Sequence, residues 1–222
     1  SSDLTELLPR FHARHPGIHV DLVDAGTERD LSRLATDVLL MFGWPPPQAA
    51  SLRTLAETRW LIVAAPSYWA RHGVPQHPSD LARHPCVLFR VPYGEVLRRF
   101  AFQRGGERVE VEVDGWLTGG HRAALDAPVF AGQMVARVND LTARQGLRDG
   151  SLQPVLLDWV GLNAPPLNLL IRRAQARQPR VRAWVDFMAD ELAAMTRHRL
   201  PAGLPPVQPS QRPDWFRRRV VA

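Results

Sequence analysis

A strand–helix–strand pattern between residues 11 and 43 constrains the fold of this chain more than any other feature. Residues 18–23 are a short apolar run bounded by turn residues, which predicts a strand. Thr27 and Asp30 have the spacing of a helix capping box, and residues 38–42 are a second apolar run. Because about ten residues of helix join the two runs, the pattern predicts a right-handed crossover between parallel strands.

Several further stretches occur in the order and spacing of one known family. They are Leu4-x-x-Leu7-Leu8-Pro9-x-Phe11, the HPGIHVDL segment that begins at His15, Asp37-Val38-Leu39-Leu40, Tyr68-Trp69-Ala70-Arg71-His72-Gly73, Pro78-Ser79-Asp80-Leu81 with His84-Pro85-Cys86, the tract 132–156 and the closing helix 179–192. Apolar residues fall three and four positions apart in 4–11 and in 181–192, which predicts two amphipathic helices. With these stretches the chain resembles, over residues 4–194, the effector-binding domain of LysR-type bacterial transcription regulators. The resemblance implies an α/β fold of the type 2 periplasmic-binding-protein kind. Such a fold has two lobes, each a mixed, mostly parallel sheet flanked by helices, and two hinge crossings between them.

The resemblance also predicts the domain organisation. Residues 1–90 and 167–194 are expected to form lobe I, residues 91–166 lobe II, and residues 195–222 a tail rich in proline and arginine. Inside lobe II, residues 99–113 alternate between apolar and polar on either side of a Gly-Gly turn, which predicts an edge hairpin. The tail is expected to be an extended appendage that packs on its own domain or on a partner, with phosphate binding by its arginines as the alternative.

The formal charge of +6 is placed very unevenly along the chain. Six arginines and a single aspartate lie after residue 194, so most of the net charge belongs to the tail and the rest of the chain is close to neutral. All the basic residues are arginines, and arginine raises the sequence pI because guanidinium titrates so high. The body of the chain therefore lacks the basic surface that a phosphate-binding domain needs.

Other features place the chain in a reducing compartment, away from membranes. No apolar run approaches the ~20 residues of a membrane span, and the first residues lack the basic and then apolar layout of a secretion signal. The one cysteine, Cys86, cannot form an internal disulfide. We therefore expect a cytoplasmic protein with no membrane partner.

Enzyme and metal motifs are missing from the sequence. It contains no G-x-S-x-G elbow, no G-x-G-x-x-G after a strand, no P-loop and no H-E-x-x-H. His12, His15 and His19 are close in sequence but have no neighbouring cysteine or carboxylate, so surface histidines are favoured over a metal site. Cys86 lies in an apolar run, which favours an inert buried thiol over a redox sensor. We predict no catalytic residue, no metal and no cofactor.

A ligand site is predicted where the parallel strands end, because exposed N–H groups of the following helices can receive an anion there. The positions from both lobes are Ala25, Gly26, Thr27, Met41, Phe42, Thr118, Gly120, His121, Val138 and Asn139. Structural alternatives remain open for these residues. Thr27 could only cap its helix, the Gly119-Gly120 pair could only make a turn, and Met41 with Phe42 could only be core.

The resemblance further implies a small-molecule effector held between the lobes, a homodimer or tetramer, and DNA contact only through an N-terminal helix-turn-helix that residues 1–222 do not contain. Related regulators often carry arginine at the position of Met41 and proline at that of Asn139. Our hypothesis is therefore an effector less acidic than a simple dicarboxylate, or an aromatic one. The alternative function is a periplasmic-type solute-binding receptor of a transport system, and an enzyme on the same fold is a third.

Overall fold

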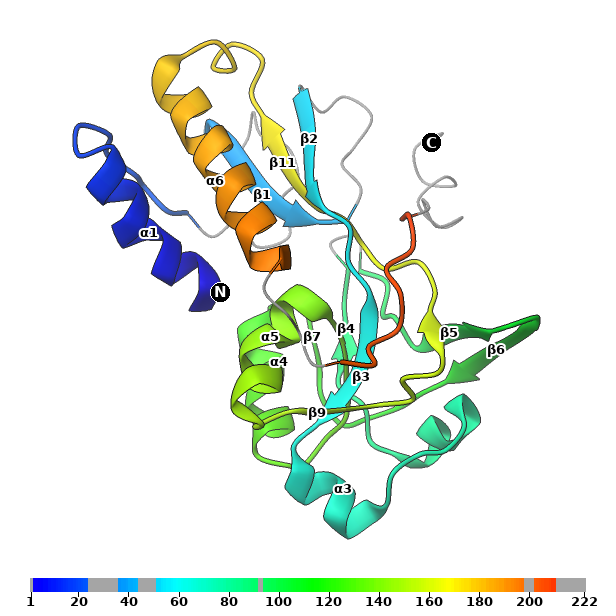
Figure 1. Cartoon of the computed structure of the whole chain (residues 1–222). Helices are drawn as coiled ribbons and strands as arrows, with labels where there is room; N and C mark the ends of the chain where they lie inside the picture. Colours follow the sequence, from blue (N-terminus) through cyan, green and yellow to red (C-terminus); the bar gives the residue numbers. More distant parts are fainter. Residues whose placement is uncertain (1, 24–35, 44–50, 92–93, 198–201, 211–222) are drawn as a thin grey trace. The chain divides into compact units, whose positions relative to one another are not determined.

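The chain folds into two compact units. The structure, a computed structural model, describes residues 2–23, 36–43, 51–91, 94–197 and 202–210 (Figure 1). Unit 1 consists of the described parts of Ser1–Glu57 and Pro165–Arg199, and unit 2 of those of Thr58–Ala164 and Leu200–Gln211. None of the helices in these ranges is long and apolar enough to cross a membrane.

The unit boundaries differ from the expected lobes. The first passage between units lies at residues 57–58 rather than 90–91, because strand β3 (Trp60–Ala64) pairs with β8 (Ala136–Asn139) of unit 2. A strand belongs to the sheet that supplies its hydrogen bonds, and apolar residues alone do not reveal which sheet that is. The second passage, at 164–165, lies within two residues of the expected position. Residues 202–210 of the tail belong to unit 2.

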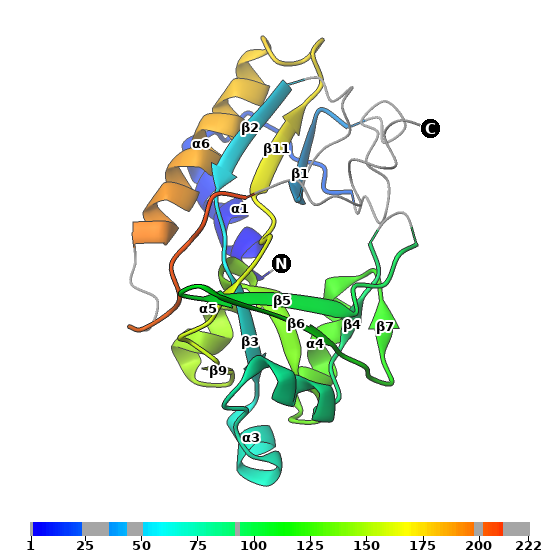
Figure 2. The same cartoon turned by 90° about the vertical axis from the view of Figure 1, so that its right-hand side faces the viewer.

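Unit 1 is a three-stranded antiparallel sheet covered by two helices. The strand order is β1 (Val38–Phe42), β11 (Leu167–Ile171), β2 (Ser51–Ala56). Figures 1 and 2 show α6 (Pro179–Arg197) lying across the sheet with α1 (Ser2–Arg14) beside it.

The two helices meet through the apolar faces that their sequences predicted. Phe11 of α1 is 1% exposed, and its ring contacts Trp184 and Phe187 of α6 at 4.8 and 5.2 Å between centroids. Val181, Val185, Met188 and Leu192 are buried along the same face of α6. Spacing of apolar residues three and four apart thus led to the correct face of both helices.

Unit 2 contains a larger sheet in the order β6 (Glu107–Glu112), β5 (Arg99–Arg104), β10 (Val160–Gly161), β3, β8, with β9 (Gln153–Val155) also on β3. The parallel pair β4 (Leu88–Phe89) and β7 (Thr118–Gly119) forms a second, small sheet. The helices are α3 (Pro66–His72), the 3₁₀ helix η1 (Pro78–Arg83), α4 (Arg122–Phe130) and α5 (Asp140–Asp149).

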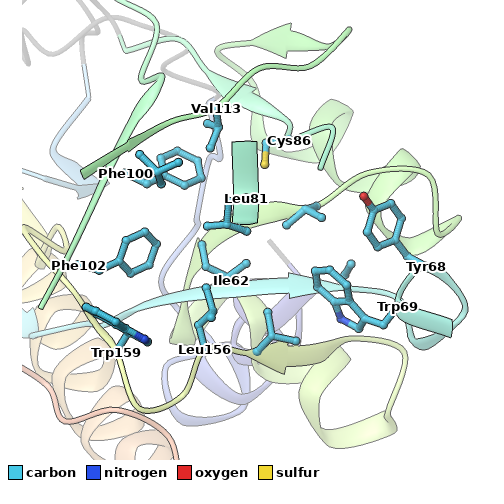
Figure 3. Close-up of a cluster of buried hydrophobic side chains, with 14 of the residues drawn as sticks. Ile62, Tyr68, Trp69, Leu81, Cys86, Phe100, Phe102, Val113, Leu156 and Trp159 are labelled. Atoms are coloured by element: carbon cyan, nitrogen blue, oxygen red, sulfur yellow. The ribbon is translucent and has the colours of Figure 1, made fainter. Parts of the chain in front are cut away.

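Two apolar clusters fill unit 2, one on each face of β3. The first contains Ile62, Leu81, Phe100, Phe102 and Trp159, which point into one shared core in Figure 3. The second, which we call the α4–α5 cluster, lies on the opposite face. It contains Leu61, Val63, Leu125, Val129, Met134, Val138 and Leu147. Alternate residues of β3 thus serve both cores, as expected for a strand buried on both sides.

Two expectations about strands turned out differently. Residues 18–23 form no strand, and none of the described residues pairs with them in a sheet. A strand needs a neighbour for its hydrogen bonds, so an apolar run alone does not suffice. The strand pairs of the described residues are mostly antiparallel, whereas mostly parallel sheets were expected. The α/β fold class itself is the expected one. The helix expected near Thr27 lies outside the described residues.

The predicted hairpin is confirmed. Strands β5 and β6 pair in antiparallel register from Arg99 with Glu112 to Arg104 with Glu107, around the Gly105-Gly106 turn (Figure 2). Glu110 and Glu112 are exposed, as the alternation requires at a sheet edge.

Candidate functional site

The predicted positions in unit 2 follow strands that run in the same direction. Strand β7 pairs with β4 in parallel, and Cys86 forms a parallel bridge with Val135, just before β8. Backbone hydrogen bonds complete this arrangement, from Arg90 N to Gly119 O and from Val87 N to Val135 O, both at 2.8 Å. The carboxyl ends of β4, β7 and β8 therefore face one edge, and helices α4 and α5 both begin there.

Helix α4 begins without a side-chain cap. Its N-cap residue His121 makes no capping side-chain hydrogen bond, and the first turn contains no acidic residue. The first N–H groups of a helix have no partner within the helix, and the helix dipole favours negative charge near them. Gly120 is exposed and Thr118 half-buried directly before this helix start. Residues 118–121 therefore place a hydroxyl, an imidazole and helix N–H groups close together in the chain.

Helix α5, by contrast, is capped by the protein itself. The Asn139 side chain accepts a hydrogen bond from Thr142 N at 2.8 Å, and Asp140 adds a carboxylate in the first turn. Asn139 is 6% exposed and Val138 4%, with Val138 in the α4–α5 cluster. The structure thus gives both residues a structural role, and helix α4 offers the more open N-terminus of the two.

In unit 1 the predicted residues are only partly described. Met41 is 6% exposed and belongs to the core of its sheet, whereas Phe42, at the end of β1, is 39% exposed. Ala25, Gly26 and Thr27 lie outside the described residues. Unit 1 also has a hollow of about 420 Å³ between α1 and residues 16–22, and it is not lined by Met41 or Phe42, the predicted site residues that the structure describes in this unit.

The thiol of Cys86 is inaccessible. The residue is fully buried, its Sγ lies 3.4 Å from the backbone oxygen of His84, and burial raises the pKa of the thiol to about 12. A protonated, buried thiol is a poor nucleophile, which supports the inert role over redox sensing. Among the described residues no group of three or more His, Cys, Asp or Glu side chains could hold a metal ion.

Two arginine sites in unit 2 were missed by sequence reasoning. The Arg137 guanidinium stacks on the rings of Phe100 and Trp60, 4.0 and 4.7 Å from their centroids, and burial lowers its pKa to about 10. Arg59 Nε donates to Asp140 Oδ2 at 2.9 Å. The partners lie between 37 and 81 positions apart in the chain, so no local pattern reveals these contacts.

Comparison with known proteins gives a consistent result. The family described as "LysR substrate binding domain" matches residues 1–193. An HTH-type transcriptional regulator of Xanthomonas campestris is 29% identical over 191 residues, which are 85% of this chain and 55% of that protein. The regulator CrgA of Neisseria meningitidis serogroup C is 26% identical, with 85% and 62% covered.

Solved structures of the same kind share the fold. The regulatory domain of CrgA, a LysR-type transcriptional regulator from Neisseria meningitidis, superposes with a TM-score of 0.74 at 26% identity, covering 85% of this chain and 91% of that one. The longer CrgA structure has a TM-score of 0.75, with 63% of that chain covered. The chain thus spans a little over half the length of the regulators it matches, and almost all of the isolated regulatory domain.

Proposed function

Because the chain belongs to the family of LysR substrate binding domains, we propose that it is the effector-sensing part of a DNA-binding transcription regulator. The matched proteins are named HTH-type transcriptional regulators, so DNA binding is assigned to a helix-turn-helix outside residues 1–222. A bacterial regulator of this kind works in the cytoplasm, where DNA lies. Its role is binding rather than catalysis, as the names of the relatives support.

The observation that carries an effector site is the uncapped start of α4. Three strands with parallel direction end at one edge of unit 2, and residues 118–121 lead from β7 into this helix. An effector oxygen that accepts hydrogen bonds fits the first-turn N–H groups, with Thr118 and His121 as further partners. Residues 25–27 and Phe42 of unit 1 remain proposed contacts. A carboxylate on an otherwise apolar or aromatic molecule agrees with the lack of arginine at Met41.

The proposed mechanism is a shift between conformations. An effector that binds one arrangement of the two units more tightly than the other shifts their equilibrium by its difference in binding free energy. Contacts between copies in a homodimer or tetramer transmit the shift to the DNA-binding domains. Light scattering at tens of micromolar tests this assembly, since a monomer alone at that concentration contradicts it.

A thermal-shift screen followed by calorimetry tests the site. Aromatic monocarboxylates, aliphatic dicarboxylates and neutral aromatic compounds are screened against residues 1–222, because a ligand at 100 times its Kd adds about 2.7 kcal/mol of stability. For the compound that binds, Thr118→Val and His121→Ala should each weaken affinity about tenfold, the effect of one lost hydrogen bond. His12→Ala, an exposed histidine on α1, is the matched control. Unchanged affinity in both site variants contradicts the site at α4, and tight binding of dicarboxylates alone contradicts the effector class.

A further inference from the structure

The C-terminal segment 202–210 binds unit 2 although the helix before it belongs to unit 1. Leu204 packs against the α4–α5 cluster, and Pro205 is buried. The residues that follow, from Pro206 to Pro209, are exposed at the surface of the same unit. An apolar side chain that packs against a core cluster is a specific attachment, because its release would expose that surface to water.

A partly buried ion pair holds the segment by its backbone. Arg59 Nη1 donates to Pro205 O at 2.5 Å, while its Nε donates to Asp140 Oδ2 at 2.9 Å. Two further hydrogen bonds join these residues. Arg59 N donates to the side-chain Oδ1 of Asp140 at 3.2 Å, and the backbone N of Asp140 donates to Arg59 O at 3.1 Å. Asp140 therefore orients the guanidinium toward the proline carbonyl. Proline has no N–H, so this carbonyl is the only backbone group with which Pro205 can be held.

The segment covers the residues where the chain passes between units. A cavity of about 180 Å³ lies between the segment and residues 58–59 and 161–164, which we call the hinge residues. Pro206, Gln208 and Pro209 line it on one side, and Thr58, Arg59, Gly161, Leu162, Asn163 and Ala164 are among the residues lining the other. The two passages lie at 57–58 and 164–165, directly beside these residues. Contacts to the segment therefore act where a hinge between the units must bend.

We propose that residues 202–210 are an intramolecular latch. The latch binds the hinge residues of unit 2 and limits the movement of unit 1 relative to unit 2. Only residues 198–201 separate the end of α6 from the latch, and five residues of extended chain span at most about 18 Å. Any movement that carries the end of α6 farther than this from the docked Ala202 must detach the latch. Prolines at 205, 206 and 209 restrict the free segment, which lowers the entropy cost of docking. The latch rests on these contacts alone and does not depend on an effector.

Hydrogen exchange tests whether the latch protects the hinge. We compare residues 1–222 carrying Leu204→Asp with the same chain carrying Val207→Asp, whose side chain is 39% exposed. In Leu204→Asp the amides of Arg59 and Asp140 should exchange about tenfold faster, the size expected for a lost hydrogen bond in a local opening. Amides of β1 and β11 in unit 1 should not change. Equal exchange at Arg59 and Asp140 in the two variants overturns the latch.

Binding of a separate peptide gives a second test, which does not depend on how the two variants fold. A labelled peptide of residues 200–211 should bind a chain ended at Arg199, and the same peptide with Leu204→Asp should not, as fluorescence anisotropy measures.

Paired spin labels at Asp190→Cys and Arg148→Cys, one in each unit, then report movement between the units, since Cys86 is buried and does not react. The label distances should spread more widely in the shortened chain. No peptide binding, or unchanged distances, contradicts the proposal.

Discussion

At the scale of single residues, a buried Tyr68–His84 pair links α3 to the loop that follows η1. The Tyr68 hydroxyl lies 2.9 Å from His84 Nδ1, and the ring of His72 stacks on Tyr68 at 4.5 Å between centroids. Burial lowers the pKa of His84, and the nearby charges of His72 and Arg83 act in the same direction. Burial also raises the pKa of Tyr68 to about 12. The neutral His84 ring is thus the form that accepts the tyrosine hydrogen bond.

This pair predicts a loss of stability in mild acid. Because the folded state holds the pKa of His84 below its ordinary value, its contribution is complete above about pH 6.5 and is lost as the pH falls toward the folded pKa. His84→Gln keeps an acceptor for Tyr68 but does not titrate. The free energy of unfolding is measured with denaturant between pH 7.5 and 5, around the ordinary histidine pKa of about 6.5. As the pH falls, it should decline more steeply for the unchanged chain than for the variant. Parallel curves of unfolding free energy against pH would show that His84 does not contribute to the pH dependence of stability.

A glycine at a close backbone approach gives a second prediction at this scale. A Cβ on Gly115 would lie 2.0 Å from the carbonyl oxygen of Cys86, whereas a Cβ on Gly106 in the hairpin turn meets no atom within 4 Å. Gly115→Ala must therefore shift backbone and should cost about 2 kcal/mol or more, as overpacking does. Gly106→Ala should change the unfolding free energy by less than about 1 kcal/mol. Equal midpoints in urea for the two variants would contradict this account.

At the scale of elements, α1 is joined to α6 by charges as well as by aromatic rings. Glu191 of α6 is 3% exposed, and its carboxylate oxygens lie 2.6 Å from Arg10 Nη1 and 3.3 Å from Arg14 Nη2. The two arginines are more than half exposed. Only the carboxylate is therefore buried, so the cost of breaking this cluster depends on which partner is removed.

This asymmetry can be measured. Replacing both Arg10 and Arg14 with alanine leaves a buried carboxylate without its cations and should cost about 3 kcal/mol. Glu191→Leu leaves two arginines that water can solvate, and it should change stability by no more than about 1 kcal/mol. Chemical denaturation of the two variants beside the natural chain gives the comparison. A larger loss of stability for Glu191→Leu than for the double arginine variant would contradict this explanation.

At the scale of the whole molecule, the two units have separate cores and separate sheets. Asn168 is the polar centre of unit 1, being 1% exposed. Its Nδ2 donates to Gly43 O at 2.6 Å, and its Oδ1 accepts from Thr54 Oγ1 at 2.8 Å. One side chain thus joins β11 to β2 and to Gly43, the residue directly after β1.

Asn168→Leu should therefore destabilise unit 1 selectively. The change leaves the buried Gly43 carbonyl and the Thr54 hydroxyl without this partner, which costs about 1–3 kcal/mol. Hydrogen exchange should accelerate at β1 and β11, while β3 and β8 of unit 2 keep their protection. Thr54→Val, which removes only one of the two hydrogen bonds, should have the smaller effect. Faster exchange of equal size in both units would show that they unfold together.

The sequence by itself determined the elements whose signal lies in neighbouring residues. The apolar stripes of α1 and α6 and the alternation in β5–β6 predicted these elements and their buried faces, because helices and hairpins are formed by residues close in the chain. Tertiary structure alone decided which sheet β3 joins, that residues 18–23 pair with none of the described strands, that Asn139 caps α5, and that the tail returns to Arg59. Each of these depends on partners distant in sequence, and short-range periodicity contains no information about them.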